Sequence, residues 1–127
     1  MKTKKLNINH IIKLHEKLIY CTGGTAGLRE RGLLESALAS PFAEYGGFLK
    51  YPTIQEKASR LAYCIIKNHP FIDGNKRIGI LAMLEFLKIN EIEFSYPHDE
   101  LINLGLSVAD GSLDYKDILE FIIKYQI

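Results

Sequence analysis

The chain has 127 residues, of which 47% are hydrophobic, and its formal net charge is +1 at pH 7. This length predicts a single domain, residues 1–127, large enough to bury one hydrophobic core. The charge lacks the basic excess expected of a nucleic-acid-binding protein. No apolar run reaches the ~18 residues of a membrane span, and the basic amino terminus does not resemble a signal peptide. We therefore expect a cytoplasmic protein that contacts neither nucleic acid nor membranes directly.

The amino-terminal half predicts two helices and a connecting segment. Apolar residues recur at helical spacing from Ile8 to Ile19, and Gly23-Gly24 should end this first helix. A second helix is predicted from about Arg29 to Ser40, because Pro41 follows. The segment Phe42 to Pro52 is rich in glycine and aromatic residues and predicts an irregular loop or a short hairpin.

The carboxy-terminal half predicts four further helices. The third begins after Thr53, an N-cap candidate with Glu56 three residues on, as in a capping box. The fourth, about Asn75 to Asn90, is apolar on nearly all sides and should be the buried centre. Two more helices are predicted, from Asp99 to about Ala109 and from Ser112 to Ile127. Together these elements predict an all-α bundle of about six helices around a central buried helix.

One short stretch concentrates the chemically useful side chains: His69-Pro70-Phe71-Ile72-Asp73-Gly74-Asn75-Lys76-Arg77. Pro70 and Gly74 predict a loop, after which the fourth helix begins. The unpaired N–H groups of a helix start attract anions. Lys76 and Arg77 add positive charge where the helix dipole favours negative side chains. This local misfit indicates that the site binds a polyphosphate.

The residue types in this stretch also fit phosphoryl transfer, which needs a base, a carboxylate for Mg²⁺ and cations on the phosphates. His69 is the candidate base, since imidazole exchanges protons near neutral pH. Asp73 is a hard oxygen ligand suited to Mg²⁺. Arg77 is expected to chelate phosphate oxygens, and Lys76 to act as a point charge. Gly74 and Asn75 are expected to bind the nucleotide phosphates at the start of the helix, where the Asn75 side chain is expected to donate to an oxyanion or to cap the helix.

Each of these residues also has a simpler interpretation. His69 could merely cap the third helix, Lys76 and Arg77 could be a solvated pair, and Asp73-Gly74 is a common turn sequence. Their combination in one loop favours a functional site. A structural zinc site is not expected, because no third and fourth ligand lie nearby in the sequence. His15, on the apolar face of the first helix, is expected to pack in the core.

This stretch resembles the motif of the Fic/Doc family, and in particular of its Doc (death-on-curing) branch. The Doc pattern is HxFx(D/N)(A/G)NKR, and the chain fills every fixed position of it. It departs from the Fic pattern, HPFx(D/E)GNGRxxR, at Lys76 and Ile80, which replace a glycine and an arginine. Residues 23–29, 32–38 and 86–90 resemble other parts of the family. The resemblance implies a Fic/Doc-like helical bundle.

The resemblance also implies a function. It implies a toxin of a toxin–antitoxin system that transfers the γ-phosphate of ATP to a protein hydroxyl, with Mg²⁺ at Asp73. The implied target is elongation factor Tu, and the implied result is arrest of translation. In the family, the segment corresponding to Phe42–Pro52 forms a flap that engages the target. Lys76 and Ile80 favour this kinase reaction, while a Fic-like adenylyltransferase and a non-catalytic nucleotide- or partner-binding module are alternatives.

Inhibition is expected to come from a separate chain. Many Fic proteins carry an inhibitory (S/T)xxxE(G/N) helix, and Ser40 to Tyr45 matches only its spacing, since Pro41 and Tyr45 do not fit. In Doc systems the inhibitor is an antitoxin that binds in trans through a disordered tail, which folds on binding.

Overall fold

The computed structural model describes residues 2–127. Its helices are α1 (Ile8–Thr22), α2 (Arg31–Ala39), α3 (Ile54–Asn68), α4 (Asn75–Ile89), α5 (His98–Ala109) and α6 (Tyr115–Tyr125), with a 3₁₀ turn, η1 (Ser40–Phe42). Strand structure within residues 2–127 is limited to a hairpin of β1 (Glu44–Tyr45) and β2 (Phe48–Leu49). The predicted all-α class is therefore confirmed. Among the described residues, no helix combines the length and the apolar character needed to cross a membrane.

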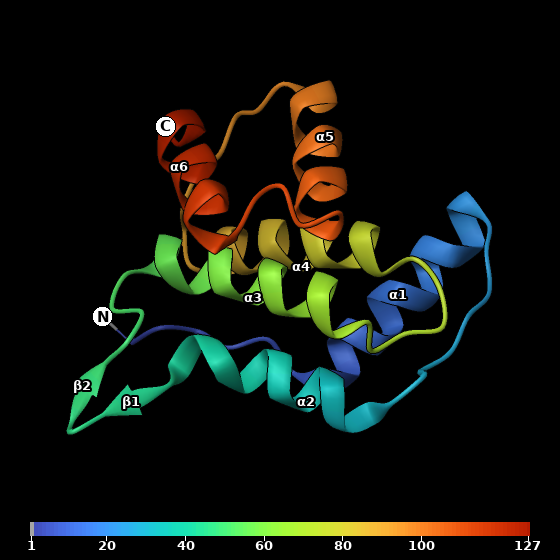
Figure 1. The fold of residues 1–127 in the computed structure, drawn as a ribbon, viewed down its shortest axis with the longest axis horizontal. Coiled ribbons are helices and arrows are strands. Elements are labelled where there is room, and N and C mark those ends of the chain that lie inside the picture. Colours follow the sequence, from blue (N-terminus) through green and yellow to red (C-terminus); the bar gives the residue numbers. More distant parts are fainter. Residues whose placement is uncertain (1) are drawn as a thin grey trace.

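Helices α3 and α4 run side by side through the middle of the molecule (Figure 1). On one side of this pair, α1 packs against α4 and α2 packs against α3. On the other side, α5 contacts both central helices and α6 contacts α3. The motif loop between α3 and α4 lies at one end of the pair, next to the carboxyl end of α1.

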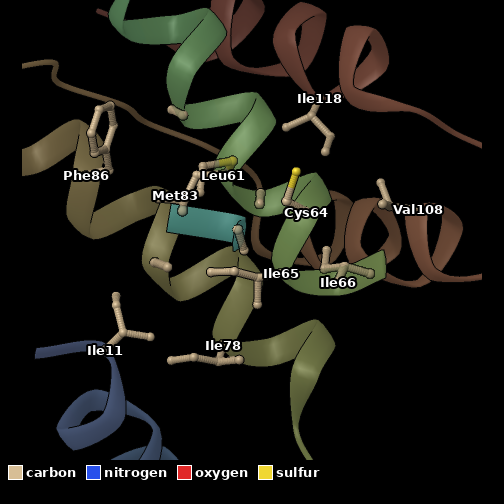
Figure 2. Close-up of a cluster of buried hydrophobic side chains, with 14 of the residues drawn as sticks. Ile11, Leu61, Cys64, Ile65, Ile66, Ile78, Met83, Phe86, Val108 and Ile118 are labelled. Atoms are coloured by element: carbon tan, nitrogen blue, oxygen red, sulfur yellow. The ribbon is translucent and has the colours of Figure 1, made fainter. Parts of the chain in front are cut away.

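The core is shared between the two central helices, which refines the expectation of one central helix. Figure 2 shows side chains of α3 and α4 facing one another, with Ile11, Val108 and Ile118 closing the cluster from α1, α5 and α6. The outer face of α4 is more open than its sequence suggests, because Leu81 and Leu84 are only partly buried. That partly open face is the one that lines the groove described below.

Gly79 allows α3 and α4 to pack closely. A Cβ atom at Gly79 would lie 2.6 Å from Ile66 Cγ1 and 3.2 Å from the Ala62 carbonyl oxygen. The first distance requires the Ile66 side chain to shift, and the second is a tight contact with backbone, so an alanine would strain the contact between the two helices. A glycine in the middle of a helix, normally unfavourable, is therefore explained here by the contact between helices.

Helix starts follow the capping chemistry of the sequence, but three of them differ from the predicted residues. Helix α5 starts at His98, one residue before the predicted Asp99. Thr53 caps α3 as predicted, since its Oγ1 accepts the Glu56 N–H at 3.0 Å. Helix α6 starts at Tyr115 rather than at Ser112, because Asp114 and Asp117 form a capping box at that point. Helix α2 starts at Arg31, since the backbone N–H groups of residues 29 and 30 bind the motif loop instead.

The segment Phe42 to Pro52 forms the short hairpin that was one of its two predicted conformations. Gly46 and Gly47 connect the strands with φ values of 58° and 84°. A two-residue turn with positive φ at both positions is favourable for glycine and matches the strand twist. The hairpin extends away from the helices (Figure 1) and leaves Tyr45 and Phe48 exposed.

Candidate active site

The candidate site is a groove of about 740 Å³ at the amino end of α4. All the residues predicted for the site line it: His69, Asp73, Gly74, Asn75, Lys76 and Arg77. Helix α5 supplies much of the opposite, apolar wall, including Leu101, Ile102 and Leu106. The groove therefore has a polar end at the motif and an apolar end between α4 and α5.

His69 ends helix α3 in a left-handed backbone conformation, with φ 53° and ψ 54°. This conformation costs a residue other than glycine on the order of 1–3 kcal/mol, so neighbouring contacts must hold it. Nδ1 of the ring lies 3.1 Å from the Ile66 carbonyl oxygen. Because a carbonyl only accepts hydrogen bonds, Nδ1 is the donor, and the neutral ring then carries its lone pair on Nε2. His69 is thus an exposed imidazole able to accept a proton at the groove.

The motif loop pairs with the loop that follows α1. The Ile72 N–H donates to the Gly27 carbonyl at 3.0 Å, and the Arg29 N–H donates to the Pro70 carbonyl at 2.7 Å. An antiparallel bridge between Leu28 and Phe71 lies between these two bonds. Residues 27–30, far away in the sequence, therefore set the path of the loop that carries His69 and Asp73.

His15 supports the same loop from inside the core. Its ring is buried and stacks on Phe71, with the ring centroids 3.8 Å apart. Its Nε2 donates to the Asp73 carbonyl oxygen at 2.7 Å. Core packing was the predicted role of His15, and the structure adds a polar contact with the motif backbone.

Asn75 has a different role from the predicted side-chain donor to an oxyanion or helix cap. Its Oδ1 accepts the Phe71 N–H at 3.0 Å, and its Nδ2 donates to the Phe71 carbonyl at 2.9 Å. The residue is only 5% exposed, and both polar atoms of its side chain are occupied in closing the loop. What Asn75 offers an anion is its backbone N–H, which lies in the first turn of α4.

The start of α4 presents unpaired backbone donors to the groove. Gly74 precedes the helix with φ 75°, and its own N–H donates to Asp73 Oδ1 at 2.8 Å. The N–H groups of Asn75, Lys76 and Arg77 follow in the first turn, where a helix has no acceptor for them. A Cβ at Gly74 would lie 3.1 Å from Ile19 Cδ1, so both space and backbone conformation favour glycine.

The Asp73 carboxylate lies between the two loops. Its Oδ2 accepts the Thr25 N–H at 3.1 Å, and Gly24 leaves room for this contact, because a Cβ there would lie 2.5 Å from Oδ2. The backbone N–H of Thr25, and then that of Gly74, hold the pKa of Asp73 below its ordinary value, with a smaller contribution from Arg77. The carboxylate is therefore ionised at neutral pH.

The described residues offer Mg²⁺ one carboxylate at this point. No group of three histidine, cysteine or acidic side chains within residues 2–127 is arranged to hold a metal ion. Mg²⁺ is typically bound by one or two carboxylates, with substrate phosphates and water as its other ligands. The ionised, half-exposed Asp73 fits that pattern.

The two cations of the motif lie in different surroundings. Lys76 is exposed in the groove and has no hydrogen-bond or ion-pair partner among the residues that the structure describes. The Arg77 guanidinium instead binds the hydroxyl of Thr22 and the carbonyl of Gly23, and lies 3.8 Å from Asp73 Oδ1. Arg77 thereby connects the end of α1 to the site, while Lys76 is the free positive charge.

The comparison with known families agrees with the motif. A model described as the Fic/DOC family matches residues 5–87, which extend from the amino-terminal segment through most of α4. This chain belongs to the Fic/Doc family. The match includes the whole motif, residues 69–77, whereas α5, which forms the opposite wall of the groove, lies outside it.

Within the Fic/Doc family, the chain is similar to a Doc protein. It is 38% identical over 77 residues to Toxin Doc of Mycolicibacterium smegmatis. The alignment covers 61% of this chain and 59% of that relative, so the chain matches about three fifths of the relative's length. The predicted resemblance to the Doc branch is thus confirmed at the level of sequence.

The sequence of this Fic/Doc chain does not by itself indicate all the residues around the site. Arg29 and Thr25 both contact the motif, and nothing in their residue types indicated this. The available signal was the resemblance of residues 23–29 to the family, which marks a segment without assigning roles to its members. Only the pairing of that segment with residues 70–72 explains why it lies next to the motif.

Proposed function

We propose that this chain is a Doc-type toxin that transfers the γ-phosphate of ATP to a hydroxyl group of a protein. The observation that carries the proposal is the position of His69, which lines the groove together with the first turn of α4 and whose Nδ1 contact leaves the lone pair on Nε2. A base and an anion-binding helix start are the parts that phosphoryl transfer requires. Family membership and the similarity to Toxin Doc support the same function.

In the proposed reaction, His69 Nε2 takes the proton of the substrate hydroxyl. The hydroxyl oxygen then forms a bond to the γ-phosphorus, while the bond from that phosphorus to the β–γ bridging oxygen breaks, and ADP leaves. The backbone N–H groups of Asn75 to Arg77 and the Lys76 ammonium hold the phosphates. Mg²⁺, bound at Asp73, would offset the negative charge on the phosphate oxygens.

The choice of γ-phosphate over AMP depends on Lys76 and Ile80. Lys76 places a free cation in the groove where the Fic pattern has glycine. Ile80 stands where that pattern has a second arginine, and it packs toward Gly105 of α5, where a Cβ would lie 3.2 Å from Ile80 Cγ1. Compared with the Fic pattern, the groove therefore gains a positive charge in the first turn of α4 and lacks one a turn further along the helix.

We also propose that the target is elongation factor Tu and that a cognate antitoxin inhibits the toxin in trans. Control by another chain is supported by the segment from Ser40 to Tyr45, which matches the inhibitory Fic helix in spacing only and lies away from the groove. Ser40 lies in η1, where its Oγ accepts a hydrogen bond from Arg60 Nε at 3.0 Å, and Glu44 lies in the exposed strand β1. Neither residue lines the groove.

The test is to incubate the purified chain with purified elongation factor Tu, or with a cell lysate, and γ-labelled or α-labelled ATP. Transfer of the γ-label alone is expected, and mass spectrometry of the target should show an added phosphate. Transfer of the α-label would contradict the kinase assignment and indicate adenylyl transfer. If neither label reaches protein with Mg²⁺ present, the result contradicts the kinase assignment and supports the alternative of a non-catalytic binding module.

A further inference from the structure

The Arg29 side chain binds the carboxyl end of helix α3, at Asn68 and His69. Its Nε donates to the His69 carbonyl oxygen at 2.7 Å, and its Nη2 donates to the Asn68 carbonyl oxygen at 3.0 Å. Its backbone N–H also donates to the Pro70 carbonyl at 2.7 Å. Through side chain and backbone, one residue thus contacts three consecutive carbonyl groups, those of residues 68, 69 and 70.

These contacts occur where the chain most needs support. The last carbonyls of a helix have no partner within the helix and carry partial negative charge, which a guanidinium offsets well. His69 occupies the left-handed position that usually belongs to glycine at a helix end. Without an external partner for its carbonyl, the backbone of His69 would be free to leave this conformation.

The backbone conformation of His69 determines where its ring points. In the observed conformation, Nδ1 donates to the Ile66 carbonyl in the last turn of α3, which leaves the lone pair of this groove-lining residue on Nε2. A change in φ and ψ at residue 69 would move the ring away from Ile66. Arg29 itself does not line the groove, so it acts on the site through the backbone of residues 68–70, and its Nε contact is with His69 itself.

We infer that Arg29 is a positioning residue, which holds His69 in the conformation and tautomer that make it a base. The inference rests on the proposed function of His69, but it concerns a residue that does not line the groove. Arg31 offers a matched control two positions away. It pairs with Glu35 on the surface of α2, with Nε 3.2 Å from Oε1, and within residues 2–127 its side chain makes no hydrogen bond or ion pair with the motif.

The first measurement is steady-state phosphate transfer by Arg29→Ala, Arg29→Lys and Arg31→Ala. We expect Arg29→Ala to lower kcat by at least ~10-fold, because small misplacements of a reacting group are costly, while the KM for ATP stays within about 2-fold. Ethylguanidinium added at millimolar concentration should restore part of kcat, and ethylammonium should restore less. Arg31→Ala should keep both constants. A parallel loss of kcat and ATP binding, or no loss, would contradict the inference.

The second measurement does not depend on activity. Long-range proton–nitrogen NMR spectra should show His69 of the unaltered protein with its proton on Nδ1. In Arg29→Ala the ring should sample both tautomers. Should Arg29→Ala fail to fold, Arg29→Lys provides the test. It keeps the positive charge but loses the guanidinium that donates to two carbonyls, so its His69 ring should sample both tautomers to a smaller degree.

The two measurements separate the two proposals. An unaltered protein that transfers no phosphate refutes the proposed function, yet the spectra still show whether Arg29 controls His69. Unchanged His69 signals in a folded Arg29→Ala protein overturn the positioning role, whether or not the unaltered protein is a kinase.

Discussion

His69 has a left-handed backbone conformation, and its ring carries a lone pair on Nε2 that can accept a proton. His69→Ala removes the proposed base while leaving the loop pairing of residues 27–30 in place. We expect transfer to fall by ~10²–10⁴-fold, the usual contribution of a general base. The measurement is label transfer from ATP, together with the thermal midpoint. His10→Ala, a change at a half-exposed histidine of α1, is the control, and full activity in a folded His69→Ala protein would assign the base elsewhere.

Lys76 is the unpaired cation of the site, and its removal should act on the reaction rather than on the fold. Lys76→Gly should sharply reduce γ-phosphate transfer, because the phosphates lose their point charge. It should also permit weak AMP transfer, limited by the missing arginine at position 80. Lys88→Gly is the control for Lys76→Gly. Lys88 is an exposed lysine of the same helix, so its replacement by glycine carries a similar cost in helix propensity. Equal losses in both variants would show that the effect is structural.

Asp73 should make stability depend on pH in the acid range. Its folded pKa lies below its ordinary value, chiefly because of the Thr25 N–H, so folding favours the ionised form. The stabilisation is complete above the unfolded pKa of ~3.9 and is lost as the pH falls through the folded pKa. Asp73→Asn should be less stable than the unaltered protein at neutral pH, with a difference that shrinks below about pH 4.

Urea unfolding between neutral and acid pH measures this difference for Asp73→Asn. Glu16→Gln, at an exposed position of α1, should track the unaltered protein throughout. A stability difference that does not change with pH would mean that the carboxylate does not depend on these backbone donors. Transfer activity of Asp73→Asn in excess Mg²⁺ and in chelator tests the proposed metal role separately.

At the level of elements, the contact between α3 and α4 determines the position of the helix start that forms the site. Gly79→Ala should destabilise the protein by about 1–3 kcal/mol, since the added Cβ overpacks a filled interface. Gly32→Ala, in α2, meets nothing within 4 Å and should stabilise by up to about 1 kcal/mol through helix propensity. Denaturant unfolding of both variants measures the contrast. A stabilising Gly79→Ala would show that the two helices separate at little cost.

Element boundaries were predictable where the capping residue acts locally. Thr53 starts α3 through a contact three residues away, and the glycine pair starting at Gly23 follows α1 as expected. The start of α2 was predicted two residues too early, because Arg29 and Glu30 donate to Pro70, forty or more positions away in the sequence. A local pattern carries no information about such a partner.

For the whole molecule, the arrangement predicts a gradient of local stability. Helices α3 and α4 lie between the other helices and should contain the most slowly exchanging amides, while the hairpin β1–β2 extends into solvent. Hydrogen exchange followed by mass spectrometry should show α3 and α4 protected longest and residues 44–49 exchanging first. Protection of the hairpin in the free protein would indicate that a partner or another copy covers it.

The sequence by itself determined the helical class, the position of the motif and the family, because each depends on residue types at short spacing. Periodicity and capping act within a turn or two, and the motif lies in nine consecutive residues. The hairpin was one of two predicted conformations, since its glycine pair suits a tight turn without requiring one.

Only the tertiary structure decided what each motif residue does. It directs the Asn75 amide to the Phe71 backbone, draws Arg77 toward the end of α1, and leaves Lys76 as the free cation. It also brings Arg29 and His15 to the motif. The physical reason is that a hydrogen-bonding side chain is satisfied by whichever partner the fold brings close, and here those partners come from segments up to 58 positions away in the chain.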